Sequence, residues 1–308
     1  MPTPTSSSRG SSSGWACNTQ PVRLLPAETL AELERLRLAV RRLPGQPGGD
    51  GSTGRAGAFG LDFHDYTPFT PGDDVRRVDW RRFQRSGDLL MRTDMDRSGH
   101  AVRVVVDRSG SMGLGAPSKL DYACRLGAAI AFCALQAGHP VSLGAFAGSD
   151  GAVLPARAGN PWLATVLRFL EELSAQGRTD LRSGLHAALS GRRGEGRIVL
   201  ISDLLDPVGA LPGLDLLAGP RRAVDVVEVT APGEADLPLG DTIDALDAET
   251  GRIRTFTVTP EVADTWRERL GQARADVAAG CAARGLNHLR VRCDDSPLAA
   301  VRALAAAR

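Results

Sequence analysis

The run Ala101-Val-Arg-Val-Val-Val-Asp-Arg-Ser-Gly-Ser111 joins an apolar segment directly to a polar one. A short, almost continuous stretch of valine is typical of a strand that is buried on both faces of a sheet. Farther along the chain, similar apolar runs alternate with segments of helical length. This alternation predicts an α/β fold with a doubly wound, mainly parallel sheet and helices on both faces. A helix and an extended arm of strands and turns are expected before the sheet.

The remaining elements follow from periodicity and from helix-capping residues. Further strands are expected at 141–146, 197–201, 224–229 and 289–291. Helices are expected at 119–135, 161–173, 211–217, 262–284 and 297–307, with another after Asp180. Ser118, Asn160 and Asp180 are the expected N-caps, whereas Asp206, which precedes Pro207, is expected in a turn. A hairpin is expected between 242–246 and 253–258.

Composition changes along the chain and predicts its organisation. The first residues are rich in Ser, Thr, Pro and Gly, which is typical of a disordered tail. The segments that we expect are a tail at 1–22, a helix and Gly-rich linker at 23–57, an arm packing on the sheet domain at 58–99, and the sheet domain at 100–308. Within the arm, strands are expected at 59–63 and 89–92.

Charge and lysine content exclude two classes of function. The formal net charge of the 308 residues is +1, which argues against a broad surface for nucleic acid. Lys119 is the only lysine among the 37 basic residues. Because a P-loop requires Gly-Lys followed by Ser or Thr, and Lys119 follows Ser118, the chain is not expected to be a P-loop NTPase.

Cysteine usage and hydropathy point to a cytoplasmic protein. The five cysteines are odd in number and form no Cys-x-x-Cys pair, which disfavours a disulfide framework or a zinc site. The N-terminus has no apolar segment of a secretory signal, and no run of about 18 apolar residues is present. We therefore expect neither export nor membrane insertion.

Oxygen-bearing side chains gather at the predicted carboxyl ends of strands. Asp107, Ser109 and Ser111 follow the first strand with alternate spacing, so a curled loop can turn all three oxygens toward one point. Thr179 and Asp203 come from other segment ends, and ligands of doubly wound sheets bind at this edge. Hard oxygen donors without histidine or thiolate suit Mg²⁺ or Mn²⁺. Asp and Ser after a strand are also ordinary turn and N-cap residues, which is the structural alternative.

This pattern is similar to the metal-ion-dependent adhesion site of von Willebrand factor A domains, over about residues 101–308. The resemblance implies that Ser109 and Ser111 hold the ion directly, Thr179 directly or through water, and Asp107 and Asp203 mostly through water. One coordination position then stays open for a carboxylate of a protein partner. The Asp-Gly that usually follows the last strand is Asp203-Leu204 in this chain, which retains the ligand.

The arm carries a second resemblance. Residues 65–80 read Asp-Tyr-Thr-Pro-Phe-Thr-Pro-Gly-Asp-Asp-Val-Arg-Arg-Val-Asp-Trp, which resembles the signature of the bacterial domain-of-unknown-function family 58. Many members carry two N-terminal membrane helices, and this chain resembles the shorter soluble subgroup. Family genes commonly neighbour those of MoxR-type AAA+ ATPases, so the resemblance implies such a partner. The charges of this stretch are expected to clasp the arm to the sheet domain, or one of its carboxylates occupies the open metal position.

Together these features predict a metal-dependent protein-interaction module that works as an adaptor or co-factor of a MoxR-type ATPase, and not an enzyme. The alternative is a metal-dependent hydrolase of phosphate or ester substrates that uses Asp107. Haloacid-dehalogenase phosphatases place a second aspartate where this chain has Ser109, and no histidine stands beside a matching acid and nucleophile.

Overall fold

We describe the protein from a computed structural model, which covers residues 66–68, 90–92, 101–189, 196–218 and 222–306. The expected tail, the first helix and its linker lie outside these residues, as does most of the arm. Within the arm, β1 (Tyr66–Pro68) pairs antiparallel with β2 (Leu90–Arg92). The strand expected at 59–63 lies outside the described residues, and β2 falls within the one expected at 89–92.

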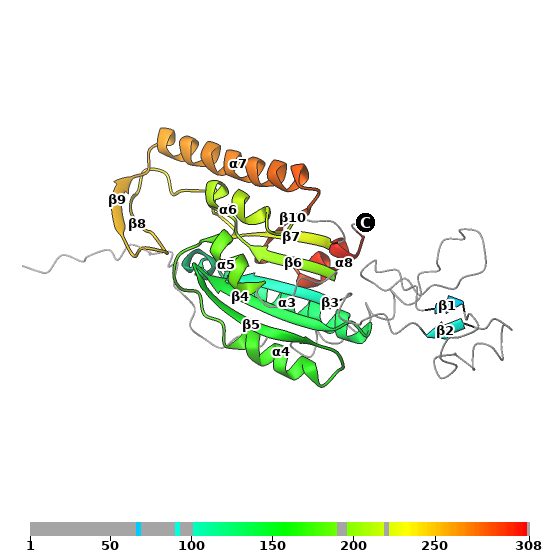
Figure 1. Cartoon of the computed structure of the whole chain (residues 1–308). Coiled ribbons are helices and arrows are strands. Elements are labelled where there is room, and N and C mark those ends of the chain that lie inside the picture. The colour runs from blue at the N-terminus through cyan, green and yellow to red at the C-terminus, as the bar shows by residue number, and fades with distance from the viewer. Residues whose placement is uncertain (1–65, 69–89, 93–100, 190–195, 219–221, 307–308) are drawn as a thin grey trace, which may run out of the picture.

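A six-stranded sheet forms the centre of the molecule (Figure 1). Its strands are β3 (Ala101–Asp107), β4 (Val141–Ala147), β5 (Asp150–Arg157), β6 (Gly196–Ser202), β7 (Arg222–Thr230) and β10 (Asn287–Arg292). They lie in the order β10-β7-β6-β3-β4-β5, and every neighbouring pair is parallel except β4 and β5. The expected doubly wound, mainly parallel sheet is therefore confirmed. The central position of β3, between β6 and β4, brings its carboxyl end beside theirs.

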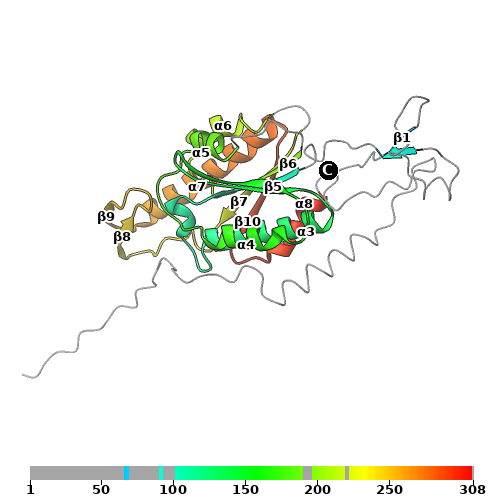
Figure 2. The same cartoon turned by 60° about the horizontal axis from the view of Figure 1, so that its bottom comes forward.

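Helices cover both faces of this sheet (Figure 2). On one side lie α3 (Lys119–Gln136), α4 (Trp162–Glu171) and α8 (Pro297–Ala306), and on the other α5 (Leu181–Ala188), α6 (Pro207–Leu214) and α7 (Pro260–Ala283). Two hydrophobic cores result, because alternate residues of a strand point to opposite faces. Val104 and Val106 belong to the core with α3, whereas Val105 belongs to the core with α5 and α6.

Two of the predicted N-caps, Ser118 and Asp180, are confirmed. The Ser118 hydroxyl accepts a hydrogen bond from the Asp121 amide at 3.0 Å, and Asp121 accepts one from the Ser118 amide, so the two form a capping box. Asp180 accepts from the Ser183 amide and caps α5.

The predictions for Asn160 and Asp206 were wrong. Helix α4 begins at Trp162, and the side-chain oxygen Oδ1 of Asn160 accepts a hydrogen bond from the Gln136 side chain on α3 instead of capping the helix. Asp206 is the N-cap of α6, accepting from the Gly209 amide, so this helix occupies 207–214 instead of 211–217.

Two antiparallel features complete the fold. The edge strand β5 was not predicted, because its sequence contains Pro155 and its side chains alternate between half-buried and exposed. The predicted hairpin is confirmed, with β8 (Thr242–Leu246) paired to β9 (Ile253–Thr257) outside the main sheet. Within the described part of the chain, no helix combines the length and the apolar character needed to cross a membrane.

Candidate functional site

The loop after β3 curls around the Asp107 carboxylate. Asp107 has no exposed surface, and its Oδ1 accepts a hydrogen bond from the Ser109 amide at 2.9 Å. Its Oδ2 accepts from the Ser202 hydroxyl at 2.6 Å, across from the end of the neighbouring strand β6. Both carboxylate oxygens are thus held, which fixes the orientation of the side chain.

Two serine hydroxyls face each other in the same loop. A 3-10 turn, η2 (Gly110–Gly113), begins directly after Ser109, and the Met112 amide donates to the Ser109 carbonyl at 3.0 Å. This turn brings the Ser111 hydroxyl to 3.2 Å from the Ser109 hydroxyl, and both residues are buried. Asp107, Ser109 and Ser111 therefore converge as their spacing predicts.

Asp203 follows β6 at the same edge of the sheet and is paired with the single lysine of the chain. The Lys119 ammonium, at the first turn of α3, lies 2.6 Å from Asp203 Oδ2 and 2.9 Å from Glu234 Oε1. Lys119 has no exposed surface, and the exposed fraction of Asp203 is 2%. Arg274 of α7 also pairs with Glu234, at 2.8 Å, so an ion-pair chain runs from Asp203 to α7.

Burial and neighbouring charges shift the pKa values of Asp107 and Lys119 at this edge of the sheet. Burial and the nearby charge of Asp203 raise the pKa of Asp107 from 3.8 to about 6, although hydrogen bonds from Ser202 and Ser109 oppose the rise. Burial alone lowers the pKa of Lys119, but the charges of Asp203 and Glu234 outweigh it, and the net shift is upward. A buried negative charge at Asp107 thus lacks full compensation, whereas Lys119 remains an ammonium.

Thr179 belongs to a segment that is tied to the loop by backbone hydrogen bonds. The Gln176 amide donates to the Arg108 carbonyl at 2.8 Å, and the Gly110 amide donates to the Gly177 carbonyl at 2.9 Å. The Thr179 hydroxyl, however, donates to the carboxylate of Glu249 at 2.6 Å. Thr179 thus lies on a neighbouring segment, and its side chain bonds the hairpin turn instead of the other four predicted residues.

The donors at this edge determine what it can bind. In the described ranges, no three His, Cys, Asp or Glu side chains gather as a metal-binding group. An ion held here therefore depends on the hydroxyl oxygens of Ser109, Ser111 and Thr179 beside the carboxylates. Hydroxyl and carboxylate oxygens are the donors that Mg²⁺ and Mn²⁺ prefer, so the residues present fit such an ion.

Three residues of this region were not found from the sequence. Ser202 directly precedes Asp203, and a polar residue at the end of a buried strand is a usable signal. Lys119 carried a signal as well, because the single lysine of an arginine-rich chain marks a place where an ammonium is required. Glu249 carried none, since only the fold brings a hairpin turn to this edge.

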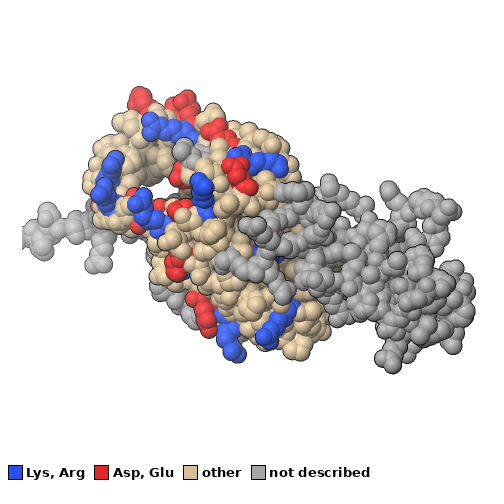
Figure 3. Space-filling view, viewed as in Figure 1, with Lys and Arg blue, Asp and Glu red and all other residues tan. Residues whose placement is uncertain are grey.

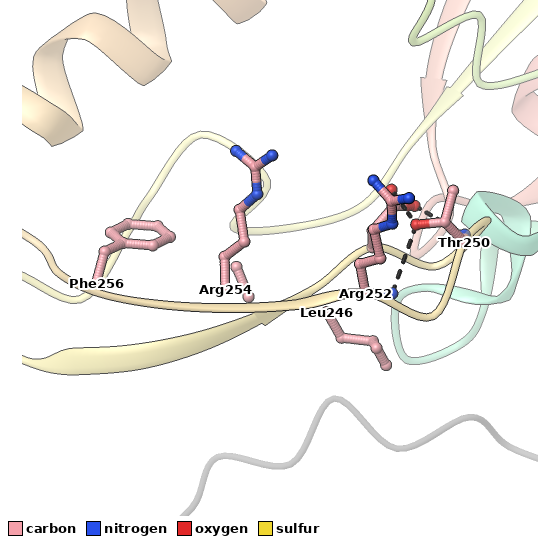
Figure 4. Close-up of a pocket in the computed structure, with 7 residues that line it drawn as sticks. Leu246, Thr250, Arg252, Arg254 and Phe256 are labelled. Atoms are coloured by element: carbon pink, nitrogen blue, oxygen red, sulfur yellow. Dashed lines mark hydrogen bonds between the residues drawn. The ribbon is translucent and has the colours of Figure 1, made fainter.

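A separate hollow lies along the β8–β9 hairpin. Its volume is about 330 Å³. Arg252, Arg254 and Phe256 project to the same side of the hairpin, whereas Leu246 projects to the other (Figure 4). Of the five predicted site residues, none lines this hollow.

Charges of both signs are interspersed over the face of the domain drawn in Figure 3. No single-sign patch dominates the described part of this face, as the low net charge leads one to expect. The charged residues of the arm signature, which were expected to clasp the sheet domain or to reach the metal site, lie outside the described residues.

The sheet, its two helical layers and the loop after β3 define the von Willebrand factor A-like class of α/β domain. The family model "Protein of unknown function DUF58" matches residues 65–277. The chain belongs to this family. It is 33% identical to "Uncharacterized protein Rv1480" of Mycobacterium tuberculosis (strain ATCC 25618 / H37Rv) over 248 residues, 78% of this chain and 77% of that protein. The values are the same for "Uncharacterized protein Mb1516" of Mycobacterium bovis.

Solved structures with a similar chain path include two relevant domains. One is the conserved hypothetical protein BatB from Bacteroides thetaiotaomicron, with 18% identity, 67% of this chain and 96% of that chain covered, and a TM-score of 0.41. The other is the SpRpn10 VWA domain, with 10% identity, 66% and 93% covered, and a TM-score of 0.38. The fold assignment stands on the strand order described above, and not on these likenesses.

Proposed function

We propose that the domain is a metal-dependent protein-interaction module. In this proposal Asp107, Ser109, Ser111, Thr179 and Asp203 hold Mg²⁺ or Mn²⁺, and a carboxylate of a protein partner completes the coordination. The observation that carries it is the convergence of buried oxygen donors from the ends of β3 and β6 around Asp107.

Electrostatics support an ion at this position. Asp107 and Asp203 repel each other in a buried environment, and Lys119 divides its charge between Asp203 and Glu234. A divalent ion bound by the two serine hydroxyls supplies positive charge beside Asp107. Asp203 pairs with Lys119 through Oδ2, so its Oδ1 is the oxygen that would face an ion bound at this edge.

The partner that we propose is a MoxR-type AAA+ ATPase, for which this chain acts as an adaptor or co-factor. The single lysine is enclosed by two carboxylates and fully buried, so it cannot contact a nucleotide phosphate. In this proposal, ATP hydrolysis is therefore assigned to the second protein.

Catalysis by the same residues receives less support. The ammonium of Lys119 is paired with two carboxylates and is not free to act as a base toward Ser109 or Ser111. The alternative hydrolase that uses Asp107 is tested by turnover of generic phosphate and ester substrates, with loss in Asp107→Asn.

The interaction proposal is tested by capture of the MoxR-type ATPase from the same genome, in Mg²⁺ and in EDTA. We expect binding by the wild type in Mg²⁺, and at least about 10-fold weaker binding in EDTA or in Ser109→Ala. Ser174→Ala, at an exposed serine outside the site, serves as the matched control. Equal capture by the wild type and Ser109→Ala contradicts the proposal.

A further inference from the structure

The turn of the β8–β9 hairpin places one carboxylate against Thr179, the residue that is predicted to complete the metal site from its own segment. Glu249 Oε1 lies 2.6 Å from the hydroxyl oxygen of Thr179, a predicted ligand. We propose that Glu249 is an intramolecular ligand of the ion, occupying the position that a partner's carboxylate takes, so that a partner must displace the hairpin turn. This inference rests on the proposed function and assigns a regulatory element to the same site.

Hydrogen bonds within the turn hold the backbone of Glu249, whose carboxylate accepts from Thr179. The Asp247 side chain accepts hydrogen bonds from the amides of Glu249 and Thr250, at 2.9 and 3.1 Å. It also accepts from the Thr250 hydroxyl, at 2.6 Å. These bonds fix the backbone on both sides of the turn, which lowers the entropy cost of holding the Glu249 carboxylate in place.

Close packing joins the turn to the loop that contains the serines. A Cβ added to Gly110 would lie 2.2 Å from the carbonyl oxygen of Ala248, the residue before Glu249. The same loop residue donates its amide to Gly177, two residues before Thr179. The loop after β3, the Thr179 segment and the hairpin turn are therefore in mutual contact, and the turn lies beside the loop after β3 in Figure 4.

The rest of the hairpin is weakly anchored, which suits an element that has to move. Leu246 and Ile253 form a cross-strand pair, yet they are 62% and 63% exposed. An isolated two-stranded ribbon is marginally stable, so lifting this one costs little beyond the contacts of its turn. A tethered carboxylate acts at an effective concentration of about millimolar, so free carboxylates that bind weakly do not replace it. A protein partner that makes further contacts with the domain can replace it.

The inference is tested with Mn²⁺ as the probe, using the full chain. Mn²⁺ affinity is measured by electron paramagnetic resonance of the free ion, and inner-sphere water by proton relaxation enhancement. In Glu249→Gln we expect affinity to fall about 10-fold and relaxivity per bound ion to rise, because water enters the vacated position. Asp244→Asn is the matched control, since Asp244 is an exposed carboxylate on the same hairpin that bonds Thr255.

The outcomes separate this inference from the proposed function. If Mn²⁺ binding requires Ser109 but is identical in the wild type and in Glu249→Gln, the metal site is supported and the role of Glu249 is contradicted. Absence of Mn²⁺ binding by the wild type overturns both. Circular dichroism of each variant shows that the fold is retained.

A second measurement tests displacement directly. Acetate added to Mn²⁺-loaded Glu249→Gln is expected to lower its relaxivity by replacing the new water molecule. The wild type should respond at least about 10-fold more weakly at the same acetate concentration, because Glu249 already occupies the position. Equal responses of the two proteins contradict the inference.

Discussion

The ammonium of Lys119 lies 2.6 Å from the carboxylate of Asp203, and the exposed fractions of the two side chains are 0% and 2%. The two ions attract each other, but both have lost their hydration. Replacing both with apolar residues can therefore leave the stability nearly unchanged, whereas replacing one leaves the other as an uncompensated buried charge. Glu234 adds a second, partly buried carboxylate to the same ammonium. Lys119 is therefore a countercharge shared by two carboxylates at the start of α3.

Replacing Lys119 with methionine should destabilise the domain strongly. The variant leaves Asp203 buried without its countercharge and leaves Glu234 with Arg274 alone, which is expected to lower the free energy of unfolding by about 3–5 kcal/mol. Urea denaturation followed by circular dichroism measures the change. Arg267→Met removes an exposed ion pair with Asp264 and should cost less than about 1 kcal/mol. Comparable losses in the two variants contradict this account.

Leu204 has a buried side chain and a left-handed backbone conformation. We therefore expect the Leu204→Gly variant to be more stable than the Leu204→Ala variant. Its φ of 47° lies in the left-handed region, and it is 4% exposed. Leu204→Ala should lower the free energy of unfolding by about 2–5 kcal/mol through lost packing. Leu204→Gly should lose about 1 kcal/mol less than alanine, because glycine adopts this φ without strain. Thermal and urea unfolding measure both, and a glycine variant less stable than the alanine variant refutes the assignment of strain.

Gly110→Ala should loosen the hairpin. The added Cβ would lie 2.2 Å from the carbonyl oxygen of Ala248. Because that oxygen belongs to the backbone and cannot rotate away as a side chain can, one of the two segments has to move. We expect faster amide hydrogen exchange over 242–257 and a loss of about 1–3 kcal/mol. Gly271→Ala is the control, because nothing lies within 4 Å of a Cβ there and helix α7 gains about 0.5–1 kcal/mol from alanine. Unchanged exchange in Gly110→Ala argues against the close approach.

The two cysteines of helix α3 should resist alkylation in the folded protein. Burial raises the pKa of Cys124 and of Cys133 from 9.0 to about 12, so the thiolate fraction at pH 8 is about 1,000-fold smaller than for an ordinary thiol. Iodoacetamide labelling at pH 8, read by peptide mass spectrometry, should modify both only after denaturation in urea. Raising the pH to 9.5 should increase the thiolate fraction of these groups but leave them mostly protonated, since that pH is still below the raised pKa. Rapid labelling of native Cys124 at pH 8 contradicts the buried position.

The sheet was predictable because its inner strands are buried on both faces and contain apolar runs, as in 104–106 and 198–201. The edge strand β5 was not, because an exposed strand with Pro155 lacks that pattern. Asn160 and Asp206 were misassigned because both have side chains that favour caps and turns equally, and tertiary contacts decide between them. Helix α6 began earlier than its apolar pattern indicated, since Asp206 and Pro207 supply a start signal of their own.

The convergence of Asp107, Ser109 and Ser111 was predictable from local spacing and from the rule that ligands gather at the carboxyl ends of parallel strands. Asp203 lies close to Asp107 because β6, which Asp203 follows, pairs with β3 in the sheet. The contact between Thr179 and Glu249 spans 70 positions and depends on where a hairpin outside the main sheet is placed. No periodicity in the sequence encodes that placement.

The absence of a side chain at Gly110 allows the loop after β3 and the β8–β9 hairpin to pack backbone against backbone. The Ala248 carbonyl occupies the space of the missing Cβ, so this close approach depends on glycine at position 110. A designer who transplants the Asp-x-Ser-x-Ser loop into another α/β scaffold would have to carry the hairpin with it or enlarge position 110 to fill the gap. Gly110 thus sets the boundary of the portable unit, which comprises two chain segments that are remote in sequence.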